Sequence, residues 1–495
     1  MFAGTTRFAG LVAVLASFAA LSLRLCLAAN VPESDGPPRV EGVVSVVLVG
    51  ATDNLAKKYL WQGLHDINAD GGKVYVFPGA TKKPAIGQQM LDDALVGNIT
   101  ASSSAKNFFI HNRVHEYSQL RSSTDYAALG EKMRAWEAGL GDEKHTGRLI
   151  YLSVPPKFYG SIAQEIDRHL RPSPDAWLRV IVEKPFGTDL DSARELAASL
   201  DASLLPREIL LVDHYLGKPG VEALRGLRAA NKAYDALLSG ENVKSVEIVM
   251  SETEDCEGRT GFYDDVGVLR DVMQNHLTMM AAFLTVSSTL RGAEQEASAR
   301  AASLKLFPSP SAASVLEQGQ YVEYTAHNDG QHSSTPTYAS VRLEAESGNW
   351  ANVPFYLVAG KALASRHAYT KIIFTSGEHL LINVQGNTEG LHGPAIRATR
   401  GLPSMKGFDG WHKDNRDTHV LKHEKAKPAY EALLFQALTG QTQNFVRVEE
   451  VLESWRIWTP LLMAEEQLQL PPLTKYRRGG VGLKHNHGPE AHDEL

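Results

Sequence analysis

The sequence predicts two domains, an α/β domain with a doubly wound parallel sheet and an α+β domain with a large, mainly antiparallel sheet. Three observations support this fold class. Short β-branched runs alternate with helical segments up to about residue 212, which is the pattern of repeated βα units. Beyond residue 320, successive strand patterns are separated by turns and not by helices. A chain of 495 residues, 43% of them apolar, is also long enough to bury more than one core.

The first strand–turn–helix unit sets the character of the α/β domain. Residues 43–49 form a continuous β-branched run that ends at Gly50, which is typical of a buried parallel strand. Residues 55–67 then carry apolar side chains at helical spacing. A strand, a glycine and a helix in this order form the first βα turn of a dinucleotide-binding fold, so we expect a Rossmann-type NAD(P)-binding domain over residues 42–212. Further strands are expected at 73–77, 108–110, 149–154 and 178–182, and a helix at 126–140.

The second domain is expected over residues 213–475. Its strand patterns follow one another without helices between them, which favours an antiparallel sheet. We expect these strands at 243–251, 320–324, 337–346, 353–358, 371–375 and 379–385. Apolar side chains at helical spacing predict helices at 221–238, 264–285, 428–438 and 448–470.

Both ends of the chain carry targeting patterns. Arg7 precedes an apolar run over residues 8–23 and small residues at Ala28, which predicts a signal peptide over residues 1–29. The run is short for a membrane-spanning helix of about 20 residues, and an uncleaved anchor is the alternative. Residues 492–495 read HDEL, the address for retention in the endoplasmic reticulum. We therefore expect a protein of that lumen that meets the HDEL-retrieval receptor and no membrane after cleavage, with a linker at 30–41 and a flexible tail at 476–495.

Charge, cysteines and a sequon narrow the class of protein further. The formal net charge of −7 without a long basic run argues against a nucleic-acid partner. Of the two cysteines, Cys26 lies in the signal peptide, so Cys256 is left alone and no internal disulfide is expected. Asn98 begins an Asn-Ile-Thr sequon, which predicts a glycoprotein in that compartment. No metal site is expected.

The turn from Gly50 to Asn54 is a candidate phosphate-binding loop. The free amides and partial positive charge of a helix N-terminus suit a pyrophosphate, and Gly50 permits the tight turn. Asp53 occupies the place where a second glycine would let backbone and phosphate touch. Asp53 either caps the helix or repels the pyrophosphate. By itself the turn fits a cofactor site and an ordinary βα turn equally well.

Two polar motifs follow predicted strands. In EKPFG, Pro185 holds Lys184 in an extended conformation at a strand end, where ligands bind in such folds. The alternative is a solvated lysine on a surface loop. In VDHYLGK, Asp213 is followed by His214, Tyr215 and, three residues later, Lys218. These three side chains together suit a phosphate, because a phosphate is best held by donors of several kinds. The alternative is a local structural network.

A third motif, RDVMQNHL, lies in the predicted helix at 264–285. Asp271 and Asn275 are four residues apart and so share a face of an α-helix. His276 is the next residue along the helix. Asp271 has the chemistry to accept a hydrogen bond from a sugar hydroxyl. His276 is a candidate general base and Asp213 its candidate partner, although a histidine on a helix is more often structural.

Six strings of the sequence resemble the glucose-6-phosphate dehydrogenase family and fall in the family's order. They span roughly residues 42–475 and read GATDNLAKK, EKPFG, VDHYLGK, EGRTGFYDDVGVLRDVMQNHL, VPFYLVAGKAL and SWRIWTPLL. Through AKKYLWQGL, STPTYASV and the targeting patterns, the chain is most similar to the lumenal hexose-6-phosphate dehydrogenase branch of the family. The C-terminal lactonase domain common in that branch is not expected here.

The resemblance implies a role for each matching residue. It implies oxidation of a hexose 6-phosphate by a homodimer, with NADP as cofactor and NAD as the alternative. The implied catalytic residues are His276 as base, Asp213 and Lys184. The implied substrate-binding residues are His214, Tyr215, Lys218, Glu252, Asp271, Lys361 and Gln385. The implied cofactor-binding residues are Gly50, Thr52, Asn54, Leu55, Thr81, Pro155, Tyr159 and Lys184.

Departures from the family pattern concentrate in the cofactor site. Asp53 and Asn54 replace a Gly-Asp pair in the phosphate loop, and Thr81 stands about where other members place an arginine for the 2′-phosphate of NADP. The two lysines that follow Thr81 can substitute for it as point charges. Asn383 stands about where other members have a basic residue for a second, structural cofactor. The chain is therefore expected to be a dehydrogenase, with a catalytically decayed sugar-phosphate-binding regulator and a structural glycoprotein as alternatives.

Overall fold

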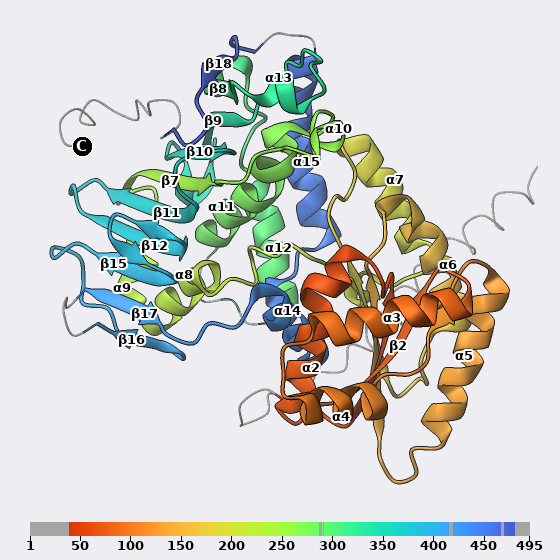
Figure 1. Cartoon of the computed structure of the whole chain (residues 1–495). Coiled ribbons are helices and arrows are strands. Elements are labelled where there is room, and N and C mark those ends of the chain that lie inside the picture. Colours follow the sequence, from red (N-terminus) through yellow and green to blue (C-terminus); the bar gives the residue numbers. More distant parts are fainter. Residues whose placement is uncertain (1–38, 287–289, 291, 415–418, 467–469, 481–495) are drawn as a thin grey trace, which may run out of the picture. The chain divides into compact units, whose positions relative to one another are not determined.

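The computed structural model describes residues 39–286, 290, 292–414, 419–466 and 470–480, which are the coloured parts of Figure 1. The expected signal peptide, most of the expected linker, Cys26 and the HDEL end of the expected tail lie outside the described residues. Among the described residues, no helix combines the length and the apolar character that crossing a bilayer requires.

A six-stranded sheet with the strand order β3-β2-β1-β4-β5-β6 forms the first half of the fold, and every pair in it is parallel. The side chains of β1 alternate between two core clusters, so both faces of the strand are buried. This is why its sequence is apolar except at Ser45, which is also buried. The doubly wound parallel sheet is thereby confirmed. Its strands are β1 Val43–Val49, β2 Lys73–Ala80, β3 Ser118–Gln119, β4 His145–Leu152, β5 Trp177–Val182 and β6 Ile209–Leu211.

The helices of this half correct one expectation from the sequence. The apolar residues 108–110 were expected as a strand but lie in helix α4, which Ser102 caps through the Ala105 amide. Phe109 is buried while Phe108 is 58% exposed, the pattern of a helix with one buried stripe, and a three-residue run cannot reveal that period. The helices are η1 Ala56–Leu60, α2 Trp61–Ala69, α3 Pro84–Asn98, α4 Ser103–Arg113, α5 Ser123–Ala138, η2 Pro156–Phe158, α6 Tyr159–His169, α7 Leu190–Asp201 and η3 Pro206–Glu208.

A ten-stranded sheet forms the second half, in the order β16-β17-β15-β12-β11-β7-β10-β9-β8-β18. Most of its pairs are antiparallel, as expected, but β10 pairs with β7 in parallel and β18 pairs with β8 in parallel. A separate hairpin joins β13 Asn387–Thr388 to β14 Leu391–His392. The ten strands are β7 Val243–Ser251, β8 Val315–Tyr321, β9 Tyr338–Glu344, β10 Pro354–Gly360, β11 His367–Phe374, β12 His379–Gln385, β15 Ala395–Ala398, β16 Trp411–Lys413, β17 Val420–His423 and β18 Thr474–Tyr476.

Two long helices expected from the sequence are interrupted. The helix expected at 221–238 breaks at Asn231, whose φ of −135° is not helical and whose side chain donates to the carbonyls of Leu227 and Lys406. The helix expected at 264–285 starts only after a turn in which Gly267 has a φ of +63°. It begins as a π-helix, η4. The helices of this half are α8 Pro219–Ala230, α9 Lys232–Leu237, α10 Thr260–Tyr263, η4 Leu269–Leu277, α11 Thr278–Thr285, α12 Ala293–Leu304, η5 Ala312–Ser314, α13 Tyr324–His327, η6 Gly348–Trp350, α14 Ala429–Thr439, η7 Thr442–Asn444 and α15 Val448–Glu466.

A continuous core joins the two sheets. One cluster of buried side chains extends from Val47 in the parallel sheet to Phe355 in the second sheet, and the described residues from Val40 onward form one compact unit. Leu211 at the end of β6 exchanges backbone hydrogen bonds with Val446, which precedes α15. The carboxyl edge of the parallel sheet is therefore fixed against helices of the second half.

Candidate active site

Two of the polar motifs meet because their strands are neighbours. β5 and β6 are parallel, and Val182 pairs with Leu211 at their carboxyl ends. EKPFG follows the first strand and VDHYLGK follows the second. Lys184 and Asp213 therefore emerge side by side at the edge where open α/β sheets bind ligands.

The π-helical start of η4 brings the third motif to the same place. In an α-helix, which turns about 100° per residue, residues five apart lie about 140° apart around the axis. A π-helix closes its hydrogen bonds between residues five apart, so Asp271 and His276 lie on one side of η4. Asp271 and Asn275 were expected to share one face of an α-helix, but the site is not formed by that face. Asn275 instead donates to the Arg270 carbonyl and accepts from the His276 amide.

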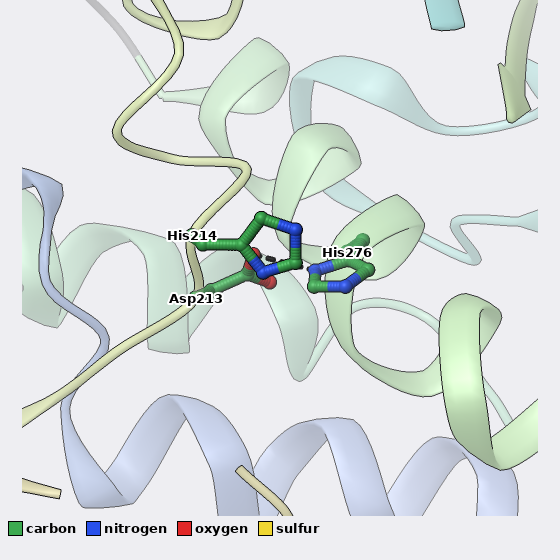
Figure 2. A group of neighbouring side chains, drawn as sticks. All are labelled: Asp213, His214 and His276. Atoms are coloured by element: carbon green, nitrogen blue, oxygen red, sulfur yellow. Dashed lines mark hydrogen bonds and ion pairs between the residues drawn. The ribbon is translucent and has the colours of Figure 1, made fainter. Parts of the chain in front are cut away.

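His276 and Asp213 form a buried hydrogen-bonded pair. His276 Nδ1 lies 2.5 Å from Asp213 Oδ1, and the same oxygen accepts from the Tyr215 amide at 2.9 Å. Figure 2 shows the His214 ring beside this pair. The Lys184 ammonium lies 2.9 Å from His276 Nε2 and donates to the Asp271 carbonyl at 3.0 Å. Because an ammonium only donates, Nε2 is an acceptor and the imidazole is neutral, with its proton on Nδ1.

The electrostatics of the pair agree with this protonation state. Burial lowers the pKa of His276, against the opposing charge of Asp213 and with the help of Lys184. Burial by itself raises the pKa of Asp213, but its interaction with His276 outweighs burial and lowers the pKa to about 2. At neutral pH the site therefore holds an ionised carboxylate and a neutral imidazole whose free nitrogen faces a cation.

A second group of charges lies next to the pair because two strands of the other sheet are parallel. Gly360 at the end of β10 pairs with Ser251 at the end of β7, so the residues that follow each strand, Lys361 and Glu252, come together. Lys361 Nζ lies 2.7 Å from Glu252 Oε2 and 3.0 Å from Asp271 Oδ2. An all-antiparallel sheet would have put these two strand ends at opposite edges.

The remaining residues expected to bind substrate lie together and are joined by hydrogen bonds and ring contacts. Lys218 donates to Gln385 Oε1, and Gln385 Nε2 donates to the Tyr215 hydroxyl at 3.0 Å. Lys218 Nζ also lies 3.5 Å from the centre of the Tyr215 ring. Burial and the nearby charge of Arg366 together lower the pKa of Lys218 to about 7, against the opposing charges of Asp213 and Glu252. We call His214, Tyr215, Lys218 and Gln385 the clamp.

Arg366 belongs to this region although sequence reasoning did not single it out. It precedes β11 and pairs with Glu254 at 2.9 Å, and its positive charge acts on Lys218 and Tyr215. The signal available in the sequence was a second basic side chain five residues after Lys361. Arg366 therefore adds a positive charge next to the clamp in a chain whose net charge is negative.

The residues expected to bind the cofactor lie at the carboxyl ends of three adjoining strands, β2, β1 and β4. Gly50 has a φ of +85°, and a side chain there would collide with the Ser153 carbonyl oxygen, 2.0 Å from the Cβ position. The strands β2 and β3 follow β1 on one side, and β5 and β6 follow β4 on the other side. The switch point of the sheet therefore lies between β1 and β4, at this edge. These residues are Gly50, Thr52, Asn54, Leu55, Thr81 and Pro155.

Asp53 does not cap the helix that follows it. Within the described residues no side-chain hydrogen bond caps η1, and the Asp53 carboxylate lies over Gly50. Burial raises the pKa of Asp53, while Lys57 and Lys82 oppose the rise. The first amides of the helix stay available to an anion. The turn therefore fits a pyrophosphate, with one carboxylate offset by two lysines.

Tyr159 differs from the other residues expected to bind the cofactor in that it lies in the core. Its side chain is fully buried, and its hydroxyl donates to the Glu183 carbonyl at 3.1 Å. The Glu183 side chain accepts from the Tyr151 hydroxyl, and burial raises the pKa of this carboxyl to about 7. These contacts hold the end of β5 next to Lys184. The Tyr159 side chain has no exposed surface with which to meet a cofactor.

Two expectations outside the site can be followed in the structure. Cys256 is free and buried, and burial raises the pKa of its thiol to about 12, which is the behaviour of an inert core residue. Asn383 is also buried, and its amide donates to the carbonyls of Gly386, Leu391 and Gly393. Asn383 is therefore committed to holding the β13–β14 hairpin.

Comparisons with known proteins agree with this architecture. Residues 47–223 match the family model described as "Glucose-6-phosphate dehydrogenase, NAD binding domain", and residues 225–397 and 408–494 match "Glucose-6-phosphate dehydrogenase, C-terminal domain". The structure resembles that of a "Glucose-6-phosphate dehydrogenase in complex with its substrate glucose-6-phosphate", with a TM-score of 0.77 and 26% identity over 90% of this chain and 97% of that chain. A glucose-6-phosphate 1-dehydrogenase from Mycobacterium avium gives a TM-score of 0.73 and 28% identity over 89% and 95%.

Curated relatives extend the comparison. The human "GDH/6PGL endoplasmic bifunctional protein" is 36% identical over 478 residues, which cover 86% of this chain and 59% of that protein. The chain thus spans about three fifths of the length of this relative. The chloroplastic "Glucose-6-phosphate 1-dehydrogenase 1" of Arabidopsis thaliana is 30% identical over 89% of this chain and 82% of that protein. The two family models and these identities together show that the chain belongs to the glucose-6-phosphate dehydrogenase family.

Proposed function

We propose that the protein oxidises hexose 6-phosphates, glucose 6-phosphate above all, to 6-phosphogluconolactone with NADP or NAD as hydride acceptor. The observation that carries the proposal is a neutral His276 held by Asp213 directly beside the clamp, with the Tyr215 and His276 rings 4.6 Å apart. A sugar whose 6-phosphate lies on the clamp has its ring within reach of the base. Glu252, Asp271 and Lys361 then line the remaining side with hydrogen-bonding groups.

The proposed reaction uses the free nitrogen of His276. The anomeric hydroxyl takes the place that the Lys184 ammonium now occupies at Nε2. Nε2 accepts the hydroxyl proton while the C1–H bond breaks and C1 gains a C=O bond, which gives the lactone. Asp213 stabilises the imidazolium, and Lys184 stabilises negative charge that develops on the sugar oxygen. The nicotinamide cofactor supplies the acceptor for the hydride. General base catalysis of this kind contributes about 10²–10⁴-fold.

The cofactor-binding roles stay part of the proposal. Gly50, Thr52, Asn54 and Leu55 would hold the pyrophosphate at the start of η1. Thr81 follows β2, and the two exposed lysines after it would meet the 2′-phosphate of NADP as point charges, which supports NADP over NAD in this proposal. Pro155 would border the cofactor next to β4, and Lys184 would touch both ligands.

A steady-state assay tests the proposed function directly. Purified protein, whose fold is checked by circular dichroism, is incubated with glucose 6-phosphate and either NADP or NAD. We expect reduced nicotinamide to form, faster with NADP at low cofactor concentration. A folded protein that forms none with either cofactor would remove the proposal.

Location and assembly are proposed on the same basis. The expected signal peptide and HDEL sequence, together with the endoplasmic relative, support residence in the lumen of the endoplasmic reticulum. Asn98 is exposed at the end of α3, where it is accessible for glycosylation. Residues 42–212 would form the NAD(P)-binding domain and residues 213–475 the substrate-binding domain, whose large sheet would mediate homodimerisation.

Substrate binding is expected to take up a proton above neutral pH. Because the pKa of Lys218 is lowered to about 7 in the free protein, most of this lysine is neutral at pH 8. A phosphate dianion raises that pKa, so binding adds a proton, and affinity falls as the pH rises above about 7. Calorimetry of glucose 6-phosphate binding in two buffers with different ionisation enthalpies measures this uptake.

The matched control for this measurement is Lys218→Arg. Arginine stays charged in proteins, so the variant keeps a cation but loses the uptake, and it also corrects for the titration of the phosphate itself. Equal proton uptake by the wild type and Lys218→Arg at pH 8 would contradict the lowered pKa.

A second candidate function is a decayed sugar-phosphate-binding regulator, and Asp53 is the observation that favours it. For an active enzyme we expect Asp53→Gly to raise cofactor affinity by less than about tenfold, because Lys57 and Lys82 already offset a partly exposed carboxylate. Fluorescence titrations with NADP and NAD measure the change. A gain of about 10²-fold or more, in a protein without turnover, would favour the regulator instead.

A further inference from the structure

The imidazole of His214 is oriented by rings and not by hydrogen bonds. Among the described residues, no hydrogen bond involves its side chain. The ring lies 4.8 Å from the His276 ring, with 81° between the planes, and 5.0 Å from the Tyr215 ring. Figure 2 shows the two imidazoles as neighbours. The Tyr430 ring lies parallel to the His214 ring, with the ring centres 5.9 Å apart and the planes within 9°. Of the three neighbouring rings, Tyr430 is therefore the one whose plane is parallel to that of this clamp residue.

Tyr430 is itself held by a further ring. It lies at the start of α14, and its ring stacks on Tyr59 of η1 with centres 4.8 Å apart and planes within 17°. Tyr59 is 45% exposed, while Tyr430 is partly buried and packs against the second core cluster, so the stack lies at the border between core and surface. Among the described residues, the Tyr430 hydroxyl makes no hydrogen bond, so the ring alone carries the contact.

The stack crosses from one half of the fold to the other. Tyr59 belongs to the helix that begins at the candidate pyrophosphate turn, and α14 packs against that helix and α2. His214 belongs to the turn after β6 and faces the candidate sugar site. Three layers, Tyr59, Tyr430 and His214, thus connect the two ligand-binding edges.

We propose that Tyr430, supported by Tyr59, is a positioning residue that presents the His214 imidazole to the 6-phosphate of the substrate. This proposal rests on the proposed function, since it assigns a use to the clamp. A neutral imidazole has one N–H donor, and the donor serves a phosphate only when the ring plane points it there. Stacking fixes that plane before the ligand arrives, so less freedom is lost on binding.

The proposal predicts a change in binding and not in the chemical step. Tyr430→Leu removes the ring, and we expect it to weaken glucose 6-phosphate binding by about two- to tenfold, the range typical of one aromatic pair. Tyr59→Leu removes only the outer layer, so its effect is expected to be smaller than that of Tyr430→Leu. The KM for the sugar phosphate is expected to rise by the same factor as Kd, with kcat within about twofold of the wild type, because Tyr430 does not touch His276 or Asp213.

The decisive control is Tyr430→Phe. It keeps the ring and loses only a hydroxyl without a partner among the described residues, so we expect wild-type affinity. Calorimetry with glucose 6-phosphate in the absence of cofactor measures binding independently of turnover, and thermal unfolding confirms that each variant is folded. Wild-type affinity of a folded Tyr430→Leu would overturn the proposal, as would a Tyr430→Phe variant as weak as Tyr430→Leu or a fall in kcat at unchanged KM.

The same experiment separates this proposal from the proposed function. If the wild type binds no glucose 6-phosphate, the clamp itself is misassigned and the proposed function fails with it. If the wild type binds the sugar phosphate and Tyr430→Leu does so equally well, only the positioning role fails.

Discussion

His276→Asn is expected to lower kcat for glucose 6-phosphate oxidation by about 10²–10⁴-fold, the contribution of a positioned general base. Asparagine keeps an amide that can donate to Asp213, so the buried carboxylate retains a partner, but it offers no basic nitrogen to the anomeric hydroxyl. The site should therefore stay assembled while the proton has no acceptor. Steady-state kinetics with NADP measure the loss.

Binding provides the control for this variant. His276 is 1% exposed and does not belong to the clamp, so the affinity for glucose 6-phosphate is expected to stay within a few-fold of the wild type. Asp213→Asn should also lower kcat, because an amide that donates to Nδ1 forces the proton of the imidazole onto Nε2. A His276→Asn variant that keeps more than a tenth of the wild-type kcat would show that another group accepts the proton.

Arg300→Met is expected to lower the free energy of unfolding by about 3–5 kcal/mol, the usual cost of leaving one member of a buried ion pair without its partner. Arg300 is 1% exposed and Glu450 is fully buried. The guanidinium makes two bonds to this carboxylate, at 2.6 and 3.1 Å, and donates to the carbonyls of Gln443 and Phe445 at 3.2 Å. Urea titration followed by fluorescence measures the loss.

The ion pair also connects stability to the site. Phe445 precedes Val446, which pairs with Leu211 two residues before Asp213, so loosening this loop is expected to disturb the His276–Asp213 pair as well. The double variant Arg300→Met with Glu450→Leu serves as the control, since it removes both charges and should recover most of the lost stability. A single variant as stable as the wild type would contradict the role assigned to the pair.

The parts of the site that could be predicted from the sequence are those encoded by short local patterns. The β-branched run before Gly50 predicts a buried strand because only a strand covered on both faces is apolar throughout. EKPFG and VDHYLGK follow such runs, and this position places Lys184 and Asp213 at strand ends without reference to any other residue. The run at 108–110 shows the limit of such patterns, because three apolar residues fit a strand and a helix stripe equally.

The tertiary structure decided which of these side chains meet. The sequence by itself determined a doubly wound sheet, the strand-end position of Lys184 and Asp213, and the residue types of a base and a phosphate clamp. Only the fold could set the π-helical register that turns His276 toward Lys184, the parallel pairing that joins Glu252 to Lys361, and the stack of Tyr430 on His214. The physical reason is that these contacts join residues 92, 109 and 216 positions apart, for which no local propensity specifies a distance.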